Sequence, residues 1–245
     1  TGPDGFASND QDINGLAAGN YQVTVTDANG CTADAAATLI APDPILVDIQ
    51  VDQYGGGHSV PCNGSNGNVN TTVQGGAIPW TYLWTGPNGF TSTDADLQNV
   101  PAGTYDLLVT DAAGCTATAS VTLTEPTPVA ATASLTDDGF GHAVTCAGDN
   151  GAIDMVISGG VAPYIIDWSA DNGFASLEED IDSLSAGVYT VIVSDLNGCK
   201  FISSYTLSAP EPIQAVLTAT PETCAGGGNG AIALTATGGS GPLSY

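Results

Sequence analysis

Cysteine is the residue type in this sequence whose spacing most directly indicates chemistry. The chain has six cysteines, no C-x-x-C pair and only two histidines. Cys31, Cys115 and Cys199 follow one another at intervals of 84 residues, and Cys62 precedes Cys146 by the same interval. Regular cysteine spacing without a metal-ligand or redox motif is typical of a disulfide framework. The pattern therefore predicts an oxidising, extracellular environment.

Two pairings of these cysteines fit the spacing. Within a repeat, Cys62 would bond Cys115 and Cys146 would bond Cys199, each across 53 residues. Strand geometry speaks against this pairing, because in a seven-strand sandwich the two cysteines lie at opposite poles, more than about 20 Å apart, whereas bridged Cα atoms lie within about 7 Å. Across a junction between repeats, Cys62 would instead bond Cys199, and the remaining cysteines would pair with repeats outside this sequence: Cys31, Cys115, Cys146 and Cys224. Both pairings stay open at this stage.

Acidic residues near predicted turns are the candidate metal ligands. Asp137, Asp138 and Asp195 could supply carboxylate oxygens to Ca²⁺ close to the junctions between repeats. Aspartate is also an ordinary turn residue, and the sequence has no D-x-[DN]-x-[DN]-G loop. The sequence therefore favours structural turns without a cofactor, with Ca²⁺ as the alternative.

Aromatic residues on predicted strands are the candidate ligand contacts. Trp84 and Trp168 keep the 84-residue interval, so we expect both in the core. Trp80 is replaced by Tyr164 in the next copy, and this variation makes Trp80 and Tyr164 candidates for an exposed pair that stacks on sugars. The exposure of these two rings separates a ligand-binding module from a purely structural one.

The two histidines do not predict an active site. His58 and His142 occupy equivalent positions in separate copies of the repeat, so we expect structural hydrogen bonds or turn positions for both. With the cysteines assigned to disulfides, no Ser-His-Asp or Cys-His constellation has support. We expect no catalytic residues and no enzymatic activity.

Composition excludes two further classes of partner. The chain has one basic side chain against 26 acidic ones, a net charge of -25, and therefore no basic patch for a phosphate backbone, which excludes nucleic acid. No apolar run approaches the roughly 20 residues that cross a bilayer, so we expect no membrane insertion of this segment. Hydrophobic residues make up 42% of the chain and alternate regularly, which predicts a packed core and not disorder.

Internal repetition defines the domain organisation. The 84-residue interval also relates Trp84 to Trp168 and the two glycine pairs that begin at Gly75 and Gly159. Pro-x-Pro sequences, which favour short extended linkers, mark the boundaries between copies. We predict two complete repeats, 42–125 and 126–209, preceded by the C-terminal half of a repeat (1–41) and followed by the N-terminal half of another (210–245).

Hydrophobic alternation gives the fold class. Tyr105, Leu107 and Val109 alternate with polar or outward residues, and a similar alternation resumes after the turn that ends at Cys115, which indicates a two-stranded hairpin with one buried face. No segment has a helical period. About seven short strands in 84 residues, with an L-x-x-x-x-x-G-x-Y corner from Leu97 to Tyr105, predict an all-β chain of tandem immunoglobulin- or fibronectin-like sandwiches forming a rod.

Several of these motifs together resemble a known family. They are C-x-G-x-x-G, then Gly-Gly-x-x-P-x-x-x-x-W, then A-G-x-Y-x-x-x-V-x-D-x-x-G-C and a closing T-x-x-x-P. The pattern resembles the SprB repeat of Bacteroidota surface adhesins. The resemblance implies a very large protein of the bacterial cell surface, exported by the type IX secretion system and carried, in gliding species, as a filamentous adhesin.

Three functions follow as hypotheses. The first is a structural or adhesive segment of an extracellular filament used in attachment or gliding motility. Its partners would be neighbouring repeats of the same chain, other filament copies or surface glycans. The alternatives are a carbohydrate-binding module and the spacer repeats of a large secreted enzyme.

Overall fold

The computed structural model describes residues 1–145, 148 and 150–245, and throughout this described part every regular element longer than three residues is a β-strand. This confirms the predicted all-β class. The chain divides into two compact units. One contains residues 1–51, 68–98 and 103–122, and the other contains residues 52–67, 99–102 and 123–245.

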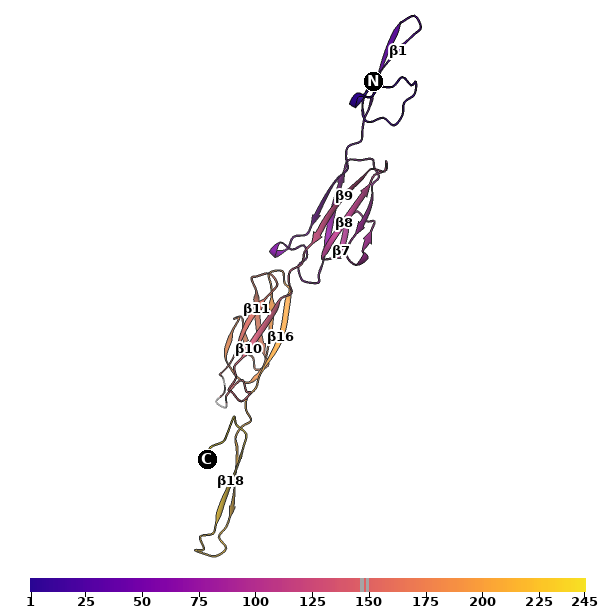
Figure 1. Ribbon diagram of the computed structural model, residues 1–245. Helices are drawn as coiled ribbons and strands as arrows, with labels where there is room; N and C mark the ends of the chain where they lie inside the picture. The colour runs from indigo at the N-terminus through magenta and orange to yellow at the C-terminus, as the bar shows by residue number, and fades with distance from the viewer. Residues whose placement is uncertain (146–147, 149) are drawn as a thin grey trace. The chain divides into compact units, whose positions relative to one another are not determined.

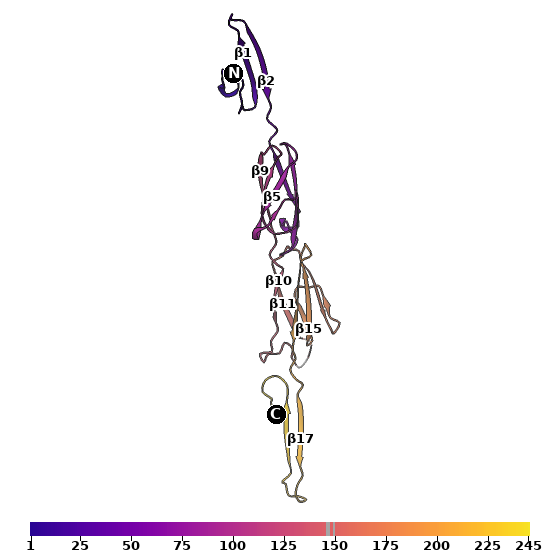
Figure 2. The same ribbon diagram turned by 90° about the vertical axis from the view of Figure 1, so that its right-hand side faces the viewer.

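Among the described residues of the second complete repeat, seven strands lie inside the predicted range 126–209. They are β10 (Ala130–Leu135), β11 (Gly151–Ser158), β12 (Ile165–Ala170), β13 (Ala175–Ser176), β14 (Ile181–Leu184), β15 (Gly187–Ser194) and β16 (Lys200–Leu207). Two antiparallel sheets result, one in the order β10-β11-β14 and one in the order β13-β12-β15-β16 (Figures 1 and 2).

The strand order identifies the form of the sandwich. In constant-type immunoglobulin domains the fourth strand joins the sheet of the first, second and fifth strands. Here the short fourth strand, β13, pairs with β12 and so belongs to the other sheet. This arrangement is the fibronectin-like form of the sandwich and confirms the predicted fold.

The core of this repeat lies between the two sheets. Ile153 and Met155 of β11 pack in one buried cluster with Trp168 of β12 and with Val191 and Val193 of β15. Alternation along β15 explains the packing, because successive strand side chains point to opposite faces. Trp168 has no exposed surface, and burial of such a ring is a large hydrophobic contribution to folding.

The first complete repeat has the same architecture. Its strands are β3 (Leu46–Val51), β4 (Asn66–Gln74), β5 (Thr81–Thr85), β6 (Thr91–Ser92), β7 (Leu97–Pro101), β8 (Gly103–Thr110) and β9 (Thr116–Leu123). They form the sheets β3-β4-β7 and β6-β5-β8-β9. Trp84 on β5 pairs with Leu107 on β8, and both are buried. The expectation that Trp84 and Trp168 are core residues is confirmed.

Two local motifs fix the ends of the strands. The Tyr189 hydroxyl donates a 2.9 Å hydrogen bond to the carbonyl oxygen of Ser185, four residues upstream, as in a tyrosine corner. The glycine pair at Gly159 and Gly160 turns the chain with φ of 70° and 59°. A side chain at Gly159 would collide with the carbonyl oxygen of Pro128, so this turn requires glycine both for its conformation and for its close contact.

The flanking segments each form one hairpin. β1 (Gly19–Thr26) pairs with β2 (Thr32–Leu39), and β17 (Gln214–Thr220) pairs with β18 (Ala231–Thr237). Val23 and Val25 are 52% and 61% exposed, whereas their equivalents Leu107 and Val109 are 1% and 0% exposed. The same alternation is therefore present in the hairpin as in the complete repeat, but without the opposing layer that buries it. The repeat boundaries, those of the two complete repeats and of the flanking segments alike, stay a prediction.

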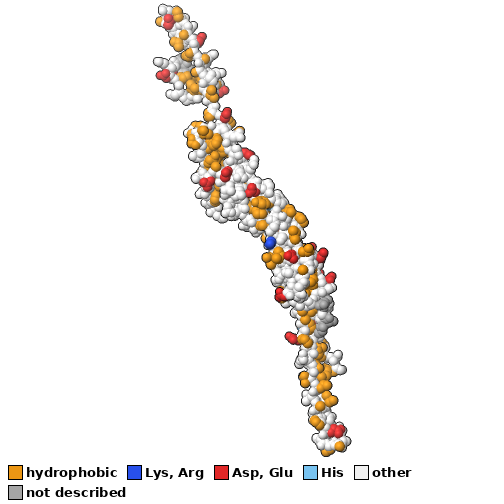
Figure 3. Space-filling model, turned by 180° about the vertical axis from the view of Figure 1, so that it is seen from behind, with side chains coloured by type: hydrophobic (Ala, Val, Ile, Leu, Met, Phe, Trp, Pro, Cys, Tyr) orange, Lys and Arg blue, Asp and Glu red, His pale blue; other side chains and the backbone are white. Residues whose placement is uncertain are grey.

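Surface properties follow the composition. On the face shown in Figure 3, acidic side chains are dispersed and basic ones are nearly absent. Within the residues described, none of the helical turns has the length or apolar character needed to cross a membrane.

Candidate functional site: the disulfide-bonded junction

The candidate site is a disulfide between two consecutive repeats. Cys62 lies between β3 and β4, Cys199 directly precedes β16, and their Cα atoms are 5.5 Å apart across a sequence separation of 137 residues. Both cysteines belong to the second compact unit, because residues 52–67 pack with residues 123–245. The pairing is the one that the pole geometry favoured.

The pairing within a repeat is not formed. Cys115 carries a free, exposed thiol, and Cys199 is already bonded to Cys62. Strand order agrees with the expectation from the sequence, because Cys62 precedes the second strand of its repeat and Cys115 follows the sixth. Cys31 and Cys224 are also free and exposed, and their pairing with other repeats stays a prediction. Cys146 lies outside the described residues.

A buried carboxylate positions Cys199. Asp195, only 3% exposed, directly follows β15. Its Oδ1 accepts hydrogen bonds of 2.9 Å from the backbone N–H groups of Asn197 and Cys199, and its Oδ2 accepts one of 3.0 Å from the N–H of Val161. One side chain therefore holds the hairpin turn and the glycine-pair turn together. Three backbone donors that would otherwise be unsatisfied have partners.

The first complete repeat has the same framework around Asp111. Its Oδ1 accepts bonds from the N–H groups of Ala113 and Cys115, and its Oδ2 accepts one of 2.9 Å from Ala77. The bond from Ala77 lowers the pKa of Asp111 most, and further backbone bonds lower it too, against a partial burial that raises it. Asp27 makes the equivalent Oδ1 contacts in the first flanking hairpin. Each of these three hairpin turns thus presents its cysteine on the same framework.

The loop that carries Cys62 is itself fixed to the chain. The N–H groups of Ser59 and Val60 both donate to the carbonyl oxygen of Thr124, at 2.9 and 3.2 Å. After the cysteine, Asn63 donates to the carbonyl oxygen of Pro126 and the N–H of Gly64 donates to the Glu125 carboxylate, at 3.3 and 2.6 Å. The loop is therefore hydrogen-bonded to the linker between the two complete repeats both before and after Cys62.

Asn197 joins this loop to the hairpin turn. Its Oδ1 accepts a 2.9 Å bond from the N–H of Gly55, and its Nδ2 donates to the carbonyl oxygens of Gly55 and Pro61, at 3.3 and 3.1 Å. A Cβ on Gly55 would lie 2.6 Å from Leu196 Cδ2 and 2.8 Å from Asn197 Oδ1, so glycine permits the close approach. These contacts adjoin the disulfide and are made only to backbone atoms of the loop.

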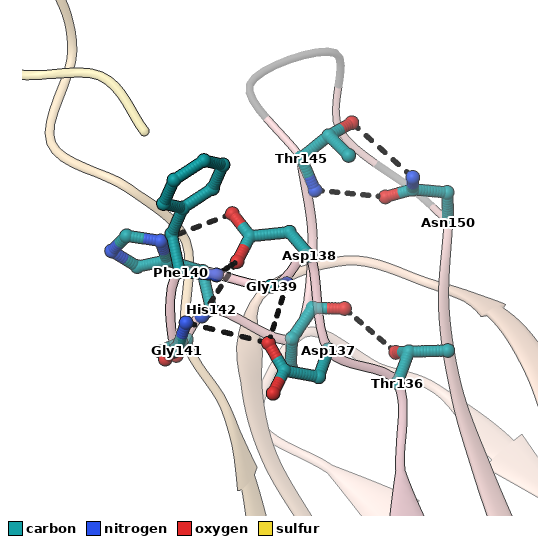
Figure 4. Close-up of polar contacts among 11 residues, drawn as sticks. Thr136, Asp137, Asp138, Gly139, Phe140, Gly141, His142, Thr145 and Asn150 are labelled. Carbon is teal, nitrogen blue, oxygen red and sulfur yellow. Dashed lines mark hydrogen bonds and ion pairs between the residues drawn. The ribbon is translucent and has the colours of Figure 1, made fainter. Parts of the chain in front are cut away.

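The Ca²⁺ candidates take part in turns. Figure 4 shows Asp137 and Asp138 directed at the backbone of their own loop. Oδ1 of Asp137 accepts bonds from the N–H groups of Gly139 and Gly141, and Oδ1 of Asp138 accepts them from Phe140 and His142. Among the described residues, no group of three or more acidic, cysteine or histidine side chains could hold a metal ion. Ca²⁺ binding stays a prediction without a preformed ligand set.

Asp138 also has a shifted pKa. Partial burial raises it, but bonds from the backbone of Phe140 and His142, from the Ser240 side chain and from the His142 ring outweigh this effect and lower the pKa to about 2. The His142 Nδ1 lies 3.1 Å from Asp138 Oδ2, which gives His142 a structural contact. The Nδ1 of the equivalent His58 is buried and makes no hydrogen bond to described residues.

Trp80 and Tyr164 are half-buried and make equivalent hydrogen bonds to the glycine-pair turns. Trp80 Nε1 donates to the carbonyl oxygen of Gly75 at 3.1 Å, and the Tyr164 hydroxyl donates to that of Gly159 at 2.6 Å. Each ring thereby holds the first residue of a glycine-pair turn. This explains why tryptophan and tyrosine exchange at the position, since both combine an apolar ring with one donor. Ligand contact by either ring stays untested.

Sequence reasoning missed Asn197 and Gly55. Two signals were present: the Gly-rich insertion at residues 52–58, and the change from Ala113 to Asn197 at equivalent places in the hairpin turn. Neither signal shows from sequence alone that the two places meet, because they belong to different repeats.

The fold and the bonded junction define a class of chain, one built from tandem immunoglobulin-like sandwiches with a covalent link between neighbours. The family model of the SprB repeat matches residues 144–173 and 216–245. These two segments confirm the resemblance to the SprB repeat that the cysteine, glycine and tryptophan spacing indicated.

Several solved structures match this chain at low sequence identity. An IgVJ-C2 molecule of amphioxus is 14% identical, with 54% of this chain and 90% of that chain covered and a TM-score of 0.27. Murine CEACAM1b is 16% identical, with 58% and 92% covered and a TM-score of 0.26. The N-terminal eight Ig domains of Down Syndrome Cell Adhesion Molecule, isoform 1.30.30, are 11% identical, with 82% and 31% covered and a TM-score of 0.26. The comparison with curated proteins returned no match.

Proposed function

We propose that this chain is a structural segment of a large adhesive filament on the outside of a bacterial cell, built from SprB repeats and used in attachment or gliding motility. Its role is mechanical and not enzymatic, and it requires no cofactor. Its partners are the neighbouring repeats of the same chain, other copies of the filament, or surface glycans. The two SprB repeat matches support the family context, and the disulfide supports an oxidising location outside the cell.

The observation that carries the proposal is the bond between Cys62 and Cys199. When the chain is pulled from its ends, the disulfide carries the force past the 137-residue interval between the two cysteines. Unfolding therefore cannot lengthen that interval. At about 3.5 Å per extended residue, the bond withholds roughly 480 Å of contour length. A filament with such bonds at successive junctions would extend little under load.

The acidic surface fits the same role. A net charge of -25 with a single basic side chain favours solubility and opposes non-specific association of the chain. The single lysine also leaves trypsin-like proteases one site in 245 residues. Both properties suit a chain exposed outside the cell.

Single-molecule stretching of the whole chain tests the proposal. We expect the oxidised chain to release about 480 Å less contour length than the Cys62→Ser variant. Cys31→Ser, which removes a cysteine that is free in the structure, is the matched control and should stretch like the unmodified chain. Equal release from the unmodified chain and from the Cys62→Ser variant would refute the mechanical role.

The competing function is carbohydrate binding. The half-buried positions of Trp80 and Tyr164 and their bonds to the glycine-pair turns support a structural role for these rings. Glycan-array binding that Trp80→Ala abolishes, in a chain that keeps its fold, would favour the carbohydrate-binding function.

A further inference from the structure

Three hairpin turns of this chain present a cysteine in a similar way, which raises the question of how Cys62 finds its partner. Cys31, Cys115 and Cys199 each donate an N–H to an aspartate of their own turn, at 2.8, 2.8 and 2.9 Å. The framework alone therefore does not distinguish one cysteine from another. A selective contact must lie elsewhere in the junction.

The residue two places before the cysteine differs between the complete repeats. It is Ala113 in the first and Asn197 in the second, and it is Asn29 in the first flanking hairpin, so this position distinguishes Cys199 from Cys115 but not from Cys31. Only the asparagine has a side chain that can bond a neighbouring loop, and Asn197 makes three hydrogen bonds to Gly55 and Pro61. Pro61 directly precedes Cys62 in the sequence, so these bonds place the loop backbone beside the cysteine pair.

The close contact at Gly55 also favours the pairing of this loop with the hairpin turn of Cys199. Gly55 lies against Leu196 and Asn197, where a Cβ would be 2.6 and 2.8 Å from them. Its backbone is outside the positive-φ region that would otherwise demand glycine. Glycine at this position therefore serves the contact with the hairpin turn and not the conformation of the loop.

The equivalent loop of the second complete repeat, residues 137–142, contacts the segment after the glycine pair at 238 and 239 with different residues. Phe140 stands where the first loop has Gly56, and its ring lies so close to Gly241 that a Cβ there would be 2.6 Å away. In the first junction the small Gly56 faces Val161, whose Cγ2 would lie 3.1 Å from a Cβ at Gly56. In each junction the larger side chain therefore lies opposite a glycine: Phe140 opposite Gly241 in one, and Val161 opposite Gly56 in the other.

We propose that Asn197 is a positioning residue that recognises the Gly55–Pro61 loop of the preceding repeat, so that docking without a covalent bond precedes and directs the Cys62–Cys199 disulfide. The inference rests on the proposed role as a tandem-repeat segment. The bond forms by exchange with a small-molecule disulfide: the two thiols lose two protons and two electrons, and the oxidant's S–S bond is cleaved to two thiols. The specificity comes from the Asn197 amide, which hydrogen-bonds to backbone atoms of the loop, and from Gly55, whose lack of a side chain permits this close contact.

The effective concentration of Cys62 and Cys199 tests this inference. The full chain is equilibrated with reduced and oxidised glutathione, and the bonded fraction is measured by mass spectrometry after alkylation. We expect Asn197→Ala to lower the effective concentration about tenfold, which corresponds to ~1.4 kcal/mol. Gly55→Ala should lower it by a similar factor, because its Cβ would collide with Leu196 and Asn197.

A control separates positioning from general stability. Asn172 is another turn asparagine of the same repeat, and its amide contacts Ser185 and Tyr189. Hydrogen exchange of β15 and β16 in the reduced chain should be unchanged by Asn197→Ala, whereas Asn172→Ala should leave the effective concentration unchanged.

Two results would overturn the inference. One is an effective concentration within about twofold of the unmodified chain, or ~0.4 kcal/mol, in both Asn197→Ala and Gly55→Ala. The other is an equal loss in Asn172→Ala. Either result would leave the stretching experiment on the Cys62→Ser variant unaffected, so failure of this inference is distinguishable from failure of the mechanical role.

Discussion

Cys62 and Cys199 are bonded to each other although 137 residues of sequence separate them. The bond closes a loop that contains most of both complete repeats. By the loop-entropy estimate, such a loop restricts the unfolded chain by about 5 kcal/mol. The disulfide therefore links the stability of one repeat to the integrity of the next.

The Asp195 carboxylate should be the main polar determinant of its hairpin turn. Asp195→Ala leaves the N–H groups of Val161, Asn197 and Cys199 without their acceptor. We expect the free energy of unfolding of this repeat to fall by about 3 kcal/mol, since unsatisfied buried donors cost ~1–3 kcal/mol each. Hydrogen exchange of β15 and β16 measures the loss. The exposed Asp182→Ala is the control, and an equal effect of both substitutions would contradict this account.

Acid should destabilise the chain through Asp111 and Asp138. Both carboxyls have a pKa below the ordinary 3.8, and that of Asp138 is about 2. Their folded pKa is depressed, so their stabilisation is fully present above about pH 4 and is lost as the pH falls towards 2. We expect the thermal midpoint to fall over this range, and to fall less in Asp138→Asn. Parallel pH profiles for the two chains would show that Asp138 has no such role.

Calcium should not stabilise the chain. Asp137, Asp138 and Asp195 each already use Oδ1 to accept backbone hydrogen bonds, which leaves fewer oxygens for Ca²⁺. A site with a Kd 100-fold below the Ca²⁺ concentration would add about 2.7 kcal/mol. We expect no such gain in calorimetry with millimolar Ca²⁺. A higher midpoint that Asp138→Asn abolishes would instead establish the metal site.

The Tyr164 hydroxyl should contribute stability through the glycine-pair turn. Tyr164→Phe removes the 2.6 Å bond to the Gly159 carbonyl oxygen and should lower the free energy of unfolding by about 1 kcal/mol. Tyr205→Phe is the matched control, because the Tyr205 ring packs beside Trp168 at a centroid distance of 6.0 Å. Urea unfolding monitored by circular dichroism compares the two. A larger loss in Tyr205→Phe would mean that the hydroxyl of Tyr164 does not hold the turn.

Much of the fold could be predicted because it depends on local patterns. Alternation along residues 187–194 places Tyr189, Val191 and Val193 on one face, and the 84-residue interval identifies Trp84 and Trp168 as core residues. Strand length and the reach of a disulfide also favoured Cys62 with Cys199. In contrast, the contact between Gly55 and Asn197 depends on the surface shape of two different repeats. The hydrophobic and repeat periods of the sequence contain no information about such a contact.

Disulfide mapping is the decisive test of the covalent bond between the two complete repeats. Cleavage after aspartate and glutamate places all six cysteines in different fragments, so a non-reduced digest of the oxidised chain identifies each pair by mass. We expect the fragment containing Cys62 to be bonded to the fragment containing Cys199. Recovery of Cys62 bonded to Cys115 would contradict this expectation, because each repeat would then be closed on itself and the covalent junction would not exist.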